Sequence, residues 1–507
     1  MMSKKYADYM DEISADDLYK GLLSYGLFSE KLPPIFESCQ FYEFCAKKRC
    51  NFSKKAYDYV RYDAMRNINT PRQLGIPVPM AYERLCQILV QNWKLIRKHF
   101  HAHTDFEEHV VSRVHMMKRK DQDALFIMNY DDWRNGGSPK DDLCIGNRFI
   151  VKADISTFFP SIYTHSIPWA LVGKKKAKGK TKGKTKGNIT EWYDSIDEAC
   201  RNLKLKETHG LLIGPHASNL ISEIILCVVD HTLCDKKWQY VRSIDDYTCF
   251  LKTKEQAERF LSDLVGELGK FDLILNHKKT KIQVLPGLAE TFWVRKLNQF
   301  ALLTSYGEVD YKQARSYFDL SIELMEESGG DAAVFKYAIK TLAGQKCTES
   351  AKKYCWKLGM HLCLIYPYLI SLMEEFVFQK FDAPADEIKK FTIQAYHDGW
   401  LRRNYEECSY AIYFALLHDF EITEIKTVDV VNSADCILQL LCYLYFKKKG
   451  GTAECKFLKE KAGELFEVDM DRNWIFVYEV LSVNDLNEEW KFLKKNGVSF
   501  LQPKFHY

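Results

Sequence analysis

The sequence predicts an α+β fold for residues 1–300 and an all-α fold for residues 301–507. Short β-rich runs alternate with helical segments between about residues 105 and 300, a mixture typical of an α+β domain. From about residue 310 onward, apolar residues recur at helical spacing, with few glycines and almost no strand signal. A chain of 507 residues is also too long for one hydrophobic core, which favours two or more domains.

The first part alternates predicted strands and helices. An apolar helical stripe follows a turn-rich stretch at residues 75–79 and consists of Leu85, Ile88, Leu89, Leu95 and Ile96. Further along, the patterns predict strands at Ala124–Met128, Arg148–Ala153 and Gln239–Leu251, and helices at Ala217–Leu233 and Lys254–Gly269.

The second part is predicted to consist of many helices of similar length. The clearest segments are Tyr311–Glu327, Ala332–Leu342 and Ser350–Met373. Helices of this kind can stack into a regular array, as in helical-repeat proteins. No clean sequence period is present, and an irregular helical bundle fits the pattern nearly as well.

Composition points to a globular protein of the cytoplasm. The hydrophobic fraction is 47% and the charged fraction 28%. No uninterrupted apolar stretch is long enough to cross a bilayer, and the charged first residues do not resemble a signal peptide, so we expect no membrane partner. The sixteen cysteines are scattered without any CxxC pair, which favours reduced intracellular thiols over disulfides and gives little support to a zinc site.

A lysine-rich segment, Gly173 to Gly187, sets the sign of the net charge. It contains eight lysines and no acid, and without it the formal charge of +4 would be 4 − 8 = −4. Its low complexity predicts a flexible loop. A solvated insertion without a role and a strand that follows nucleic-acid phosphates explain this composition equally well.

Two adjacent acids, Asp245 and Asp246, interrupt a run of β-forming residues. Acids are disfavoured within strands, so the pair is best placed at the tip of a hairpin. Neighbouring carboxylates repel each other, and a hard divalent cation such as Mg²⁺ relieves that repulsion through oxygen ligands. Taken alone, a polar turn with two aspartates would be the commoner explanation.

A third acid, Asp154, follows the predicted strand at Arg148–Ala153 directly. Three carboxylates on neighbouring strands can hold two metal ions about 3.5–4 Å apart, the arrangement used for in-line phosphoryl displacement. One ion would activate an attacking 3′-hydroxyl, and the other would stabilise the triphosphate and the leaving pyrophosphate.

The order of these segments resembles the palm of reverse transcriptases. The segments around Asp154 and Ile244–Tyr247 are similar to motifs A and C. Further segments are similar to motif B, motif D and the primer grip: Gly210–Ser218, Leu275–Thr280 and Thr291–Leu297. The resemblance implies a right-hand polymerase, with fingers and palm in residues 1–300 and motifs A to E at about 149–300. An α-helical thumb or helical-repeat domain would follow in residues 301–507.

The resemblance also assigns individual residues. It implies that two Mg²⁺ ions, or Mn²⁺ in their place, bind Asp154, Asp245, Asp246 and Ile155. It further implies that the incoming dNTP contacts Ile155, Phe159, Gly214 and Lys279.

Two of these assignments compete with plainer explanations. Phe159 stands where an aromatic ring would exclude a ribose 2′-hydroxyl. Phe158 is the natural core residue, because neighbours on a strand face opposite ways. A single lysine such as Lys279 is more often a solvated surface charge. Ile213 stands where many reverse transcriptases have glutamine, a departure that puts ordinary templated fidelity in doubt.

More narrowly, three segments resemble the bacterial abortive-infection (AbiK-like) and related defence-associated reverse transcriptases: Asp154–Trp169, Ile76–Tyr82 and Tyr311–Asp319. That resemblance implies antiphage defence, a homo-oligomer, product DNA and an RNA partner, such as a dedicated non-coding RNA template. It also implies a second way to start synthesis, on a tyrosine of the protein itself. Template-independent, terminal-transferase-like synthesis and a catalytically idle nucleic-acid-binding assembly protein are the alternatives. An RNA-synthesising polymerase is disfavoured by the aromatic Phe159.

Overall fold

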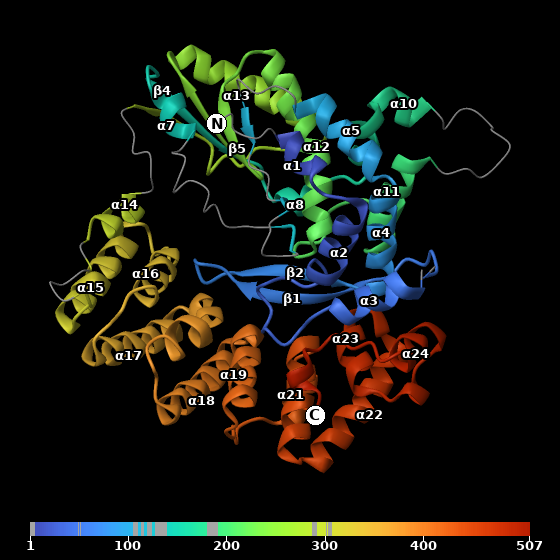
Figure 1. Ribbon diagram of the computed structural model, residues 1–507, viewed down its shortest axis with the longest axis vertical. Helices are drawn as coiled ribbons and strands as arrows, with labels where there is room; N and C mark the ends of the chain where they lie inside the picture. The colour runs from blue at the N-terminus through green and yellow to red at the C-terminus, as the bar shows by residue number, and fades with distance from the viewer. Residues whose placement is uncertain are drawn as a thin grey trace.

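The computed structural model describes residues 6–48, 50, 52–104, 110–112, 116–118, 124–126, 139–179, 191–285, 292–300, 302 and 307–507. These residues form a two-stranded sheet, a five-stranded sheet and many helices. In Figure 1 the five-stranded sheet and its helices lie at the top, the two-stranded hairpin in the middle, and the C-terminal helices in an arc below.

The N-terminal elements are helices around one hairpin: α1 (Tyr6–Asp11), α2 (Ala15–Tyr25), α3 (Cys39–Lys48), β1 (Tyr59–Met65), β2 (Pro71–Pro77), α4 (Pro79–Gln91) and α5 (Trp93–Thr104). Helix α2 begins with a capping box, in which Ser14 and Asp17 satisfy each other's backbone amides. Helix α4 begins at Pro79, whose fixed φ suits a first helical position. The apolar stripe predicted from Leu85 to Ile96 is helical but is divided between two helices, because α4 ends at Gln91 and Leu95 and Ile96 lie in α5.

The larger sheet has the strand order β3 (Val110–Ser112), β5 (Tyr240–Ser243), β6 (Asp246–Leu251), β4 (Phe149–Asp154) and β7 (Lys281–Val284). Only β3 and β5 are parallel neighbours; the other pairs are antiparallel. Helix α13 (Lys254–Gly269) packs on β4 and β6 and on α12 (His216–Asp235). The strands predicted at Arg148–Ala153 and Gln239–Leu251 and both predicted helices of this part are confirmed. Of Ala124–Met128, residues 124–126 are described and form only an isolated bridge between Phe126 and Met116.

Helix α12 is long and rich in apolar residues. Among the described helices it alone is long and apolar enough to cross a membrane, but 78% of its most apolar window is buried inside the protein. It also carries two buried acids, Glu223 and Asp230. These features are those of a central core helix.

Shorter helices connect the strands and helices of this part: α7 (Pro139–Cys144), α8 (Phe158–Ser161), α9 (Ser166–Val172), α10 (Lys174–Gly179), α11 (Trp192–Asn202) and α14 (Phe292–Gln299). The prediction of a flexible loop over Gly173–Gly187 is wrong for α10, which is helical. The ammonium groups of Lys174 and Lys178 lie 3.9 and 5.1 Å from the ring centroid of Trp169, and these cation–π contacts hold α10 against α9. Residues 180–187 lie outside the described part of the chain.

The C-terminal part is all helical: α15 (Tyr311–Glu327), α16 (Ala333–Ala343), α17 (Glu349–Ile365), η2 (Pro367–Leu372), η3 (Met373–Phe378), α18 (Ala385–Arg402), α19 (Tyr405–His418), α20 (Thr427–Asn432), α21 (Cys436–Lys449), α22 (Thr452–Val468), α23 (Met470–Val480), η4 (Val483–Asp485), α24 (Glu488–Lys495) and η5 (Pro503–Phe505). Each helix packs mainly on those near it in sequence, and together they follow an arc (Figure 1). This arrangement is a stacked array and not a bundle around one shared core.

One predicted helix of this part is interrupted. The segment Ser350–Met373 was expected to be continuous, but α17 ends at Ile365 and a 3₁₀ turn and a π-helical turn follow. Pro367 causes the break, because proline lacks the amide that would continue the helix and restricts the residue before it.

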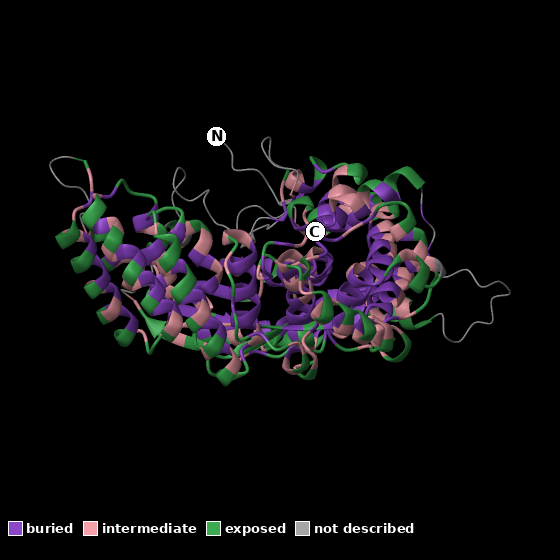
Figure 2. Cartoon of the chain, turned by 90° about the horizontal axis from the view of Figure 1, so that it is seen from below, coloured by how far each residue is buried: buried purple, intermediate pink, exposed green. Residues whose placement is uncertain are grey.

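The helical array returns to the N-terminal elements at its far end. The carboxylate of Glu406 accepts a hydrogen bond from the amide of Met65 on β1 at 2.6 Å, and Arg472 pairs with Asp58 at 2.6 Å. Trp474, which is fully buried, stacks on Phe28. Buried residues therefore run without a break through both parts of the chain, as Figure 2 shows from below.

Candidate active site

Strand pairing brings three aspartates to one end of the larger sheet. Strand β4 ends at Asp154, and its register with β6 places Asp154 opposite Asp246. Asp245 lies in the tight turn between β5 and β6, where Ile244 adopts a left-handed φ of 54°. The backbone oxygen of Asp245 accepts a hydrogen bond from the amide of Ile155 at 3.2 Å, which ties this turn to the end of β4. The predicted hairpin tip and the predicted strand-end acid thus lie side by side.

The three carboxylates oppose one another electrostatically. Burial and the charges of Asp245 and Asp154 raise the pKa of Asp246 to about 6. Burial and the charge of Asp154 also raise the pKa of Asp245. One cation lies directly on the group: the Nζ of Lys279 is 2.6 Å from Oδ2 of Asp154, which is 8% exposed. A single lysine therefore offsets part of the charge of three acids.

The donor set fits divalent metal ions. Carboxylate oxygens are the ligands that hard cations prefer, and a bound cation would offset the burial and mutual repulsion that raise the pKa values of Asp245 and Asp246. Ile155 has no ligand atom in its buried side chain, so only its backbone oxygen could contribute. Asp154, Asp245 and Asp246 therefore supply the type of ligand atom that a divalent ion prefers.

The repulsion predicts an unusual effect of Asp246→Asn on stability. The pKa of Asp246 is higher in the folded protein than its ordinary 3.8, so ionisation destabilises the fold above about pH 6 and has no effect below the ordinary value. We expect the substitution to stabilise the metal-free protein at about pH 8 by up to about 1 kcal/mol, since solvent still reaches part of this side chain and screens the repulsion. The gain should disappear at about pH 4.

Urea unfolding with EDTA at both pH values measures this difference. Added Mg²⁺ should then stabilise the wild type more than the variant. A variant that is less stable than the wild type at both pH values would contradict the proposed repulsion.

The segment that carries Lys279 is fixed alongside Asp154 by backbone contacts. The amide of Asn276 donates to the backbone oxygen of Asp154 at 2.7 Å, and the amide of Ser156 donates to Ile274 at 2.8 Å. Lys279 extends from this segment with a side chain that is 58% exposed. Its ammonium is therefore anchored at the acids and also open to solvent, where a phosphate could reach it.

Phe158 and Phe159 differ in exposure, as expected, but for another reason. Both belong to the short helix α8, so the alternation of a strand does not apply. Phe158 is 3% exposed and Phe159 is only partly buried. The backbone oxygen of Phe159 accepts a hydrogen bond from the amide of Leu211 at 2.8 Å, which joins motif A to motif B. Phe158 is thus a core residue, and Phe159 is the more exposed of the two rings.

Gly214 lies where motif B turns into α12. Its φ of 125° is a conformation that residues with a side chain rarely adopt, and Pro215 follows as the N-cap of α12. The preceding residue, Ile213, accepts a hydrogen bond from the amide of Gly75 on β2 at 2.9 Å. Motif B is thereby held between the β1–β2 hairpin and the sheet.

Sequence reasoning missed a buried ion pair behind the acids. Arg242 on β5 is fully buried, and its guanidinium donates hydrogen bonds of 2.7–3.1 Å to Asp230 and Glu223 on α12. Burial opposes its charge, but the two carboxylates outweigh burial and hold the pKa of Arg242 well above its usual value. Arg242 also donates to the backbone oxygen of Ile244 at 2.9 Å, next to Asp245. The available signal was two acids seven residues apart in an otherwise apolar helix.

The class of this domain follows from a family comparison. Residues 94–320 match the family model described as reverse transcriptase (RNA-dependent DNA polymerase). This range contains β4, β5, β6, all three aspartates and Lys279. The chain therefore contains a reverse transcriptase domain, the domain of RNA-directed DNA polymerases.

Among solved structures, the chain is similar to yeast telomerases at low identity. It matches apo telomerase from Candida tropicalis truncated from its C-terminal domain (12% identity, TM-score 0.30, 46% of this chain and 51% of that chain). It also matches telomerase from Candida albicans in complex with the TWJ fragment of telomeric RNA (12% identity, TM-score 0.31, 68% of this chain and 62% of that chain). The chain thus spans less than two thirds of the length of these telomerases. No curated protein matches it.

Proposed function

We propose that this protein is an RNA-directed DNA polymerase that adds dNTPs at Asp154, Asp245 and Asp246 with divalent ions, Mg²⁺ in the first instance. The observation that carries the proposal is the register of β4 with β6, which pairs Asp154 with Asp246 inside a reverse transcriptase domain. When bound, such ions activate the attacking 3′-hydroxyl and neutralise the triphosphate and leaving pyrophosphate. Replacement of Mg²⁺ by Mn²⁺ is the variation to test.

Other groups around the acids suit a nucleotide. Lys279 can exchange its contact with Asp154 for a triphosphate oxygen. Arg72 on β2 lies near enough to Asp245 to be attracted by its charge, although burial lowers the pKa of Arg72. Gly214 presents no side chain at the turn before α12, and Ile155 can contribute its backbone oxygen. These cations and backbone groups would orient the triphosphate, while the ring of Phe159 would face the sugar.

Phe159→Ala should increase the use of rNTPs relative to dNTPs, because removal of the ring opens space for a 2′-hydroxyl. We expect the ratio of kcat/KM values for dNTP and rNTP to fall by about tenfold or more, which corresponds to about 1.4 kcal/mol. Phe158→Ala serves as the control: it should cost about 3–5 kcal/mol of stability and leave sugar selectivity unchanged. Unaltered selectivity in Phe159→Ala would assign that ring to packing alone.

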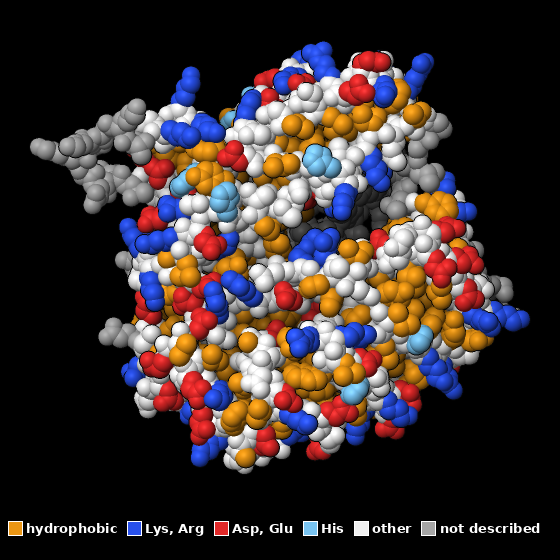
Figure 3. All heavy atoms as spheres, turned by 180° about the vertical axis from the view of Figure 1, so that it is seen from behind, with side chains coloured by type: hydrophobic (Ala, Val, Ile, Leu, Met, Phe, Trp, Pro, Cys, Tyr) orange, Lys and Arg blue, Asp and Glu red, His pale blue; other side chains and the backbone are white. Residues whose placement is uncertain are grey.

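A group of lysines where the N-terminal part meets the helical array supports nucleic-acid binding. The ammonium groups of Lys31 and Lys336 lie 4.9 and 5.4 Å from the ring centroid of Tyr368, and Lys340 lies over Phe376. Burial and the neighbouring Lys31 and Lys340 lower the pKa of Lys336 to about 8. Seen from behind in Figure 3, Lys and Arg side chains gather where the surface is hollowed between the mixed part and the helical array. The phosphates of an RNA or of product DNA would neutralise these lysines, whose positive charges repel one another.

The start of synthesis is a separate part of the proposal. The family resemblance supports a tyrosine hydroxyl in place of a primer. Tyr410 and Tyr445 are poor candidates, because both are buried and their hydroxyls hydrogen-bond to backbone groups. Label that stays with the protein after incubation with labelled dNTP, denaturation and nuclease digestion would support protein priming, and label lost entirely with the nucleic acid would exclude it.

The biological setting rests on the same resemblance. We place the reaction in bacterial antiphage defence, in the cytoplasm, with a homo-oligomer and a dedicated non-coding RNA. Phage plating on cells that express the wild type or Asp245→Asn tests the defence role. Light scattering measures the oligomeric state, and sequencing of the co-purified nucleic acid identifies the RNA. Equal plating efficiency on both strains would exclude the defence role and would not contradict the polymerase activity.

One assay separates the candidate activities. Purified protein is given Mg²⁺ or Mn²⁺ with labelled dNTPs, singly and together, on RNA templates, on DNA templates and without template. Incorporation that follows an RNA template supports the proposal. Incorporation of single dNTPs without regard to template supports terminal-transferase-like synthesis instead. No incorporation under any condition would leave a nucleic-acid-binding assembly protein.

A further inference from the structure

Two packed helices present ligand residues to each other away from the aspartates. Helix α5 carries His99 and His103, and helix α12 carries Cys227 and His231. Each pair has a spacing of four residues, which places both side chains on the same face of a helix. Because α5 packs against α12, the two pairs face each other.

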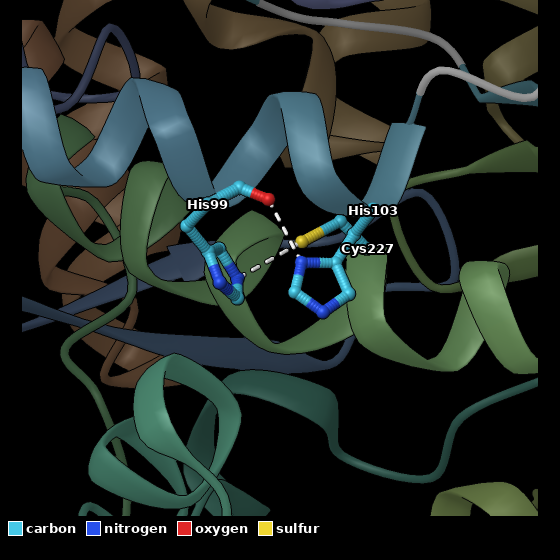
Figure 4. A group of neighbouring side chains, drawn as sticks. All are labelled: His99, His103 and Cys227. Atoms are coloured by element: carbon cyan, nitrogen blue, oxygen red, sulfur yellow. Dashed lines mark hydrogen bonds between the residues drawn. The ribbon is translucent and has the colours of Figure 1, made fainter.

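The distances are those of a compact cluster. His99, His103 and Cys227 each offer a ligand atom within 4.8 Å of the others, and Nε2 of His99 is 3.3 Å from Sγ of Cys227. Figure 4 shows the two imidazoles next to each other, with the thiol of Cys227 close to both. The ring of His231 is 5.2 Å from that of His103, centroid to centroid. Ligand atoms around a tetrahedral Zn²⁺ are roughly 3.3–3.6 Å apart, so small side-chain movements would suffice.

The chemistry of this cluster differs from that of the aspartates. Imidazole nitrogen and thiolate sulfur are the ligands of Zn²⁺ in structural sites, whereas Mg²⁺ prefers oxygen. Among the described residues, His99, His103 and Cys227 are the one group of three or more His, Cys, Asp or Glu side chains whose ligand atoms all lie within 4.8 Å of one another. His99 is buried, and a neutral imidazole is the form that binds a metal ion. Cys227 is fully buried and would lose its thiol proton on binding.

Without metal, these donors bond to helix carbonyls. Nε2 of His99 lies 2.9 Å from the backbone oxygen of Ile224, and Nδ1 of His103 lies 2.8 Å from that of His99. Metal coordination would replace these contacts, and a net hydrogen bond contributes far less than a structural zinc ion. The exchange therefore favours the bound form.

We propose that the four side chains bind a structural Zn²⁺ ion that links α5 to α12, with His231 as the fourth ligand. Helix α12 begins directly after Gly214 and carries the carboxylates that hold Arg242. An ion at this position would fix the motif B helix against the N-terminal helices. Its role is structural, and the site is independent of the polymerase reaction.

Metal content of the full-length protein tests the proposal. We expect about one zinc per chain after dialysis, measured by elemental analysis, and a Co²⁺-substituted form with thiolate-to-metal charge-transfer absorption. His103→Gln and Cys227→Ser should each weaken zinc binding by about a hundredfold or more and remove the increase in melting temperature on zinc addition. His103 is only partly buried, so its variant should fold even if Cys227→Ser does not.

Matched controls lie on the same two helices. His101→Gln on α5 and Cys234→Ser on α12 change the same residue types outside the cluster and should keep full zinc content. Asp245→Asn should also keep it, which separates this site from the aspartates. Wild-type protein without zinc after growth and dialysis in zinc-containing medium, or undiminished zinc in His103→Gln, would overturn the proposal.

Discussion

Asp245→Asn and Asp154→Asn should each abolish measurable dNTP incorporation while the protein remains folded. Each substitution keeps the shape of the side chain but removes a carboxylate that we propose as a metal ligand. Loss of a metal ion from a phosphoryl-transfer site removes several kcal/mol of transition-state stabilisation, and about 4 kcal/mol already corresponds to roughly a thousandfold in rate. Primer extension or single-nucleotide incorporation measures the loss, and circular dichroism shows that the fold is retained.

A matched control for this prediction is Asp272→Asn. Asp272 is an exposed aspartate of the same domain with a φ of 61°, a conformation that asparagine adopts readily. We expect wild-type incorporation from this variant. If soluble Asp245→Asn or Asp154→Asn also incorporated dNTPs at the wild-type rate, the three aspartates would not form the polymerase site.

Arg242→Met should lower the free energy of unfolding by about 3–5 kcal/mol, the largest effect on stability that we expect from a single substitution behind the site. The change leaves Asp230 and Glu223 buried without their cation. It also removes the hydrogen bond from Arg242 to the backbone of Ile244, which supports the turn of Asp245. Against a typical stability of about 5–15 kcal/mol this is a large loss, and urea unfolding measures it directly.

Two comparisons identify the cause of that loss. Arg259→Met, on the exposed face of α13, should change stability by less than about 0.5 kcal/mol. Combining Arg242→Met with Glu223→Leu and Asp230→Leu should restore much of the stability, because no charge is then left unpaired. A triple variant that is less stable than Arg242→Met would show that shape, and not charge, is decisive at this position.

The local signals in the sequence were sufficient for many elements. Helix α13 and helix α15 have the predicted bounds, Lys254–Gly269 and Tyr311–Glu327, because each begins with a capping box and continues with a clear apolar period. Asp245 and Asp246 could be placed at a hairpin tip, since a pair of acids between β-forming residues leaves few other positions. The roles of Ile155, Phe159, Gly214 and Lys279 at a nucleotide remain predictions.

Other elements depended on contacts that no local pattern contains. The lysines of α10 form a helix because Trp169 lies beside them, and Lys279 contacts Asp154 because its segment runs along the end of β4. The C-terminal array returns to β1 through Glu406, a contact across 341 residues of sequence. Such pairings are decided by packing, and a local sequence window does not include the partner.

The sequence by itself determined the kind of chemistry: three acids in two β-rich segments, in an order that resembles a polymerase palm. Periodicity, capping and turn preferences act over a few residues, so they are written in the sequence and can be recognised there. Only the tertiary structure decided which residues that are separated in sequence come into contact. It placed Arg242 between two acids of α12 and brought His99 and His103 to Cys227, because burial and helix packing bring together residues of different elements, which are 128 positions apart for His99 and Cys227.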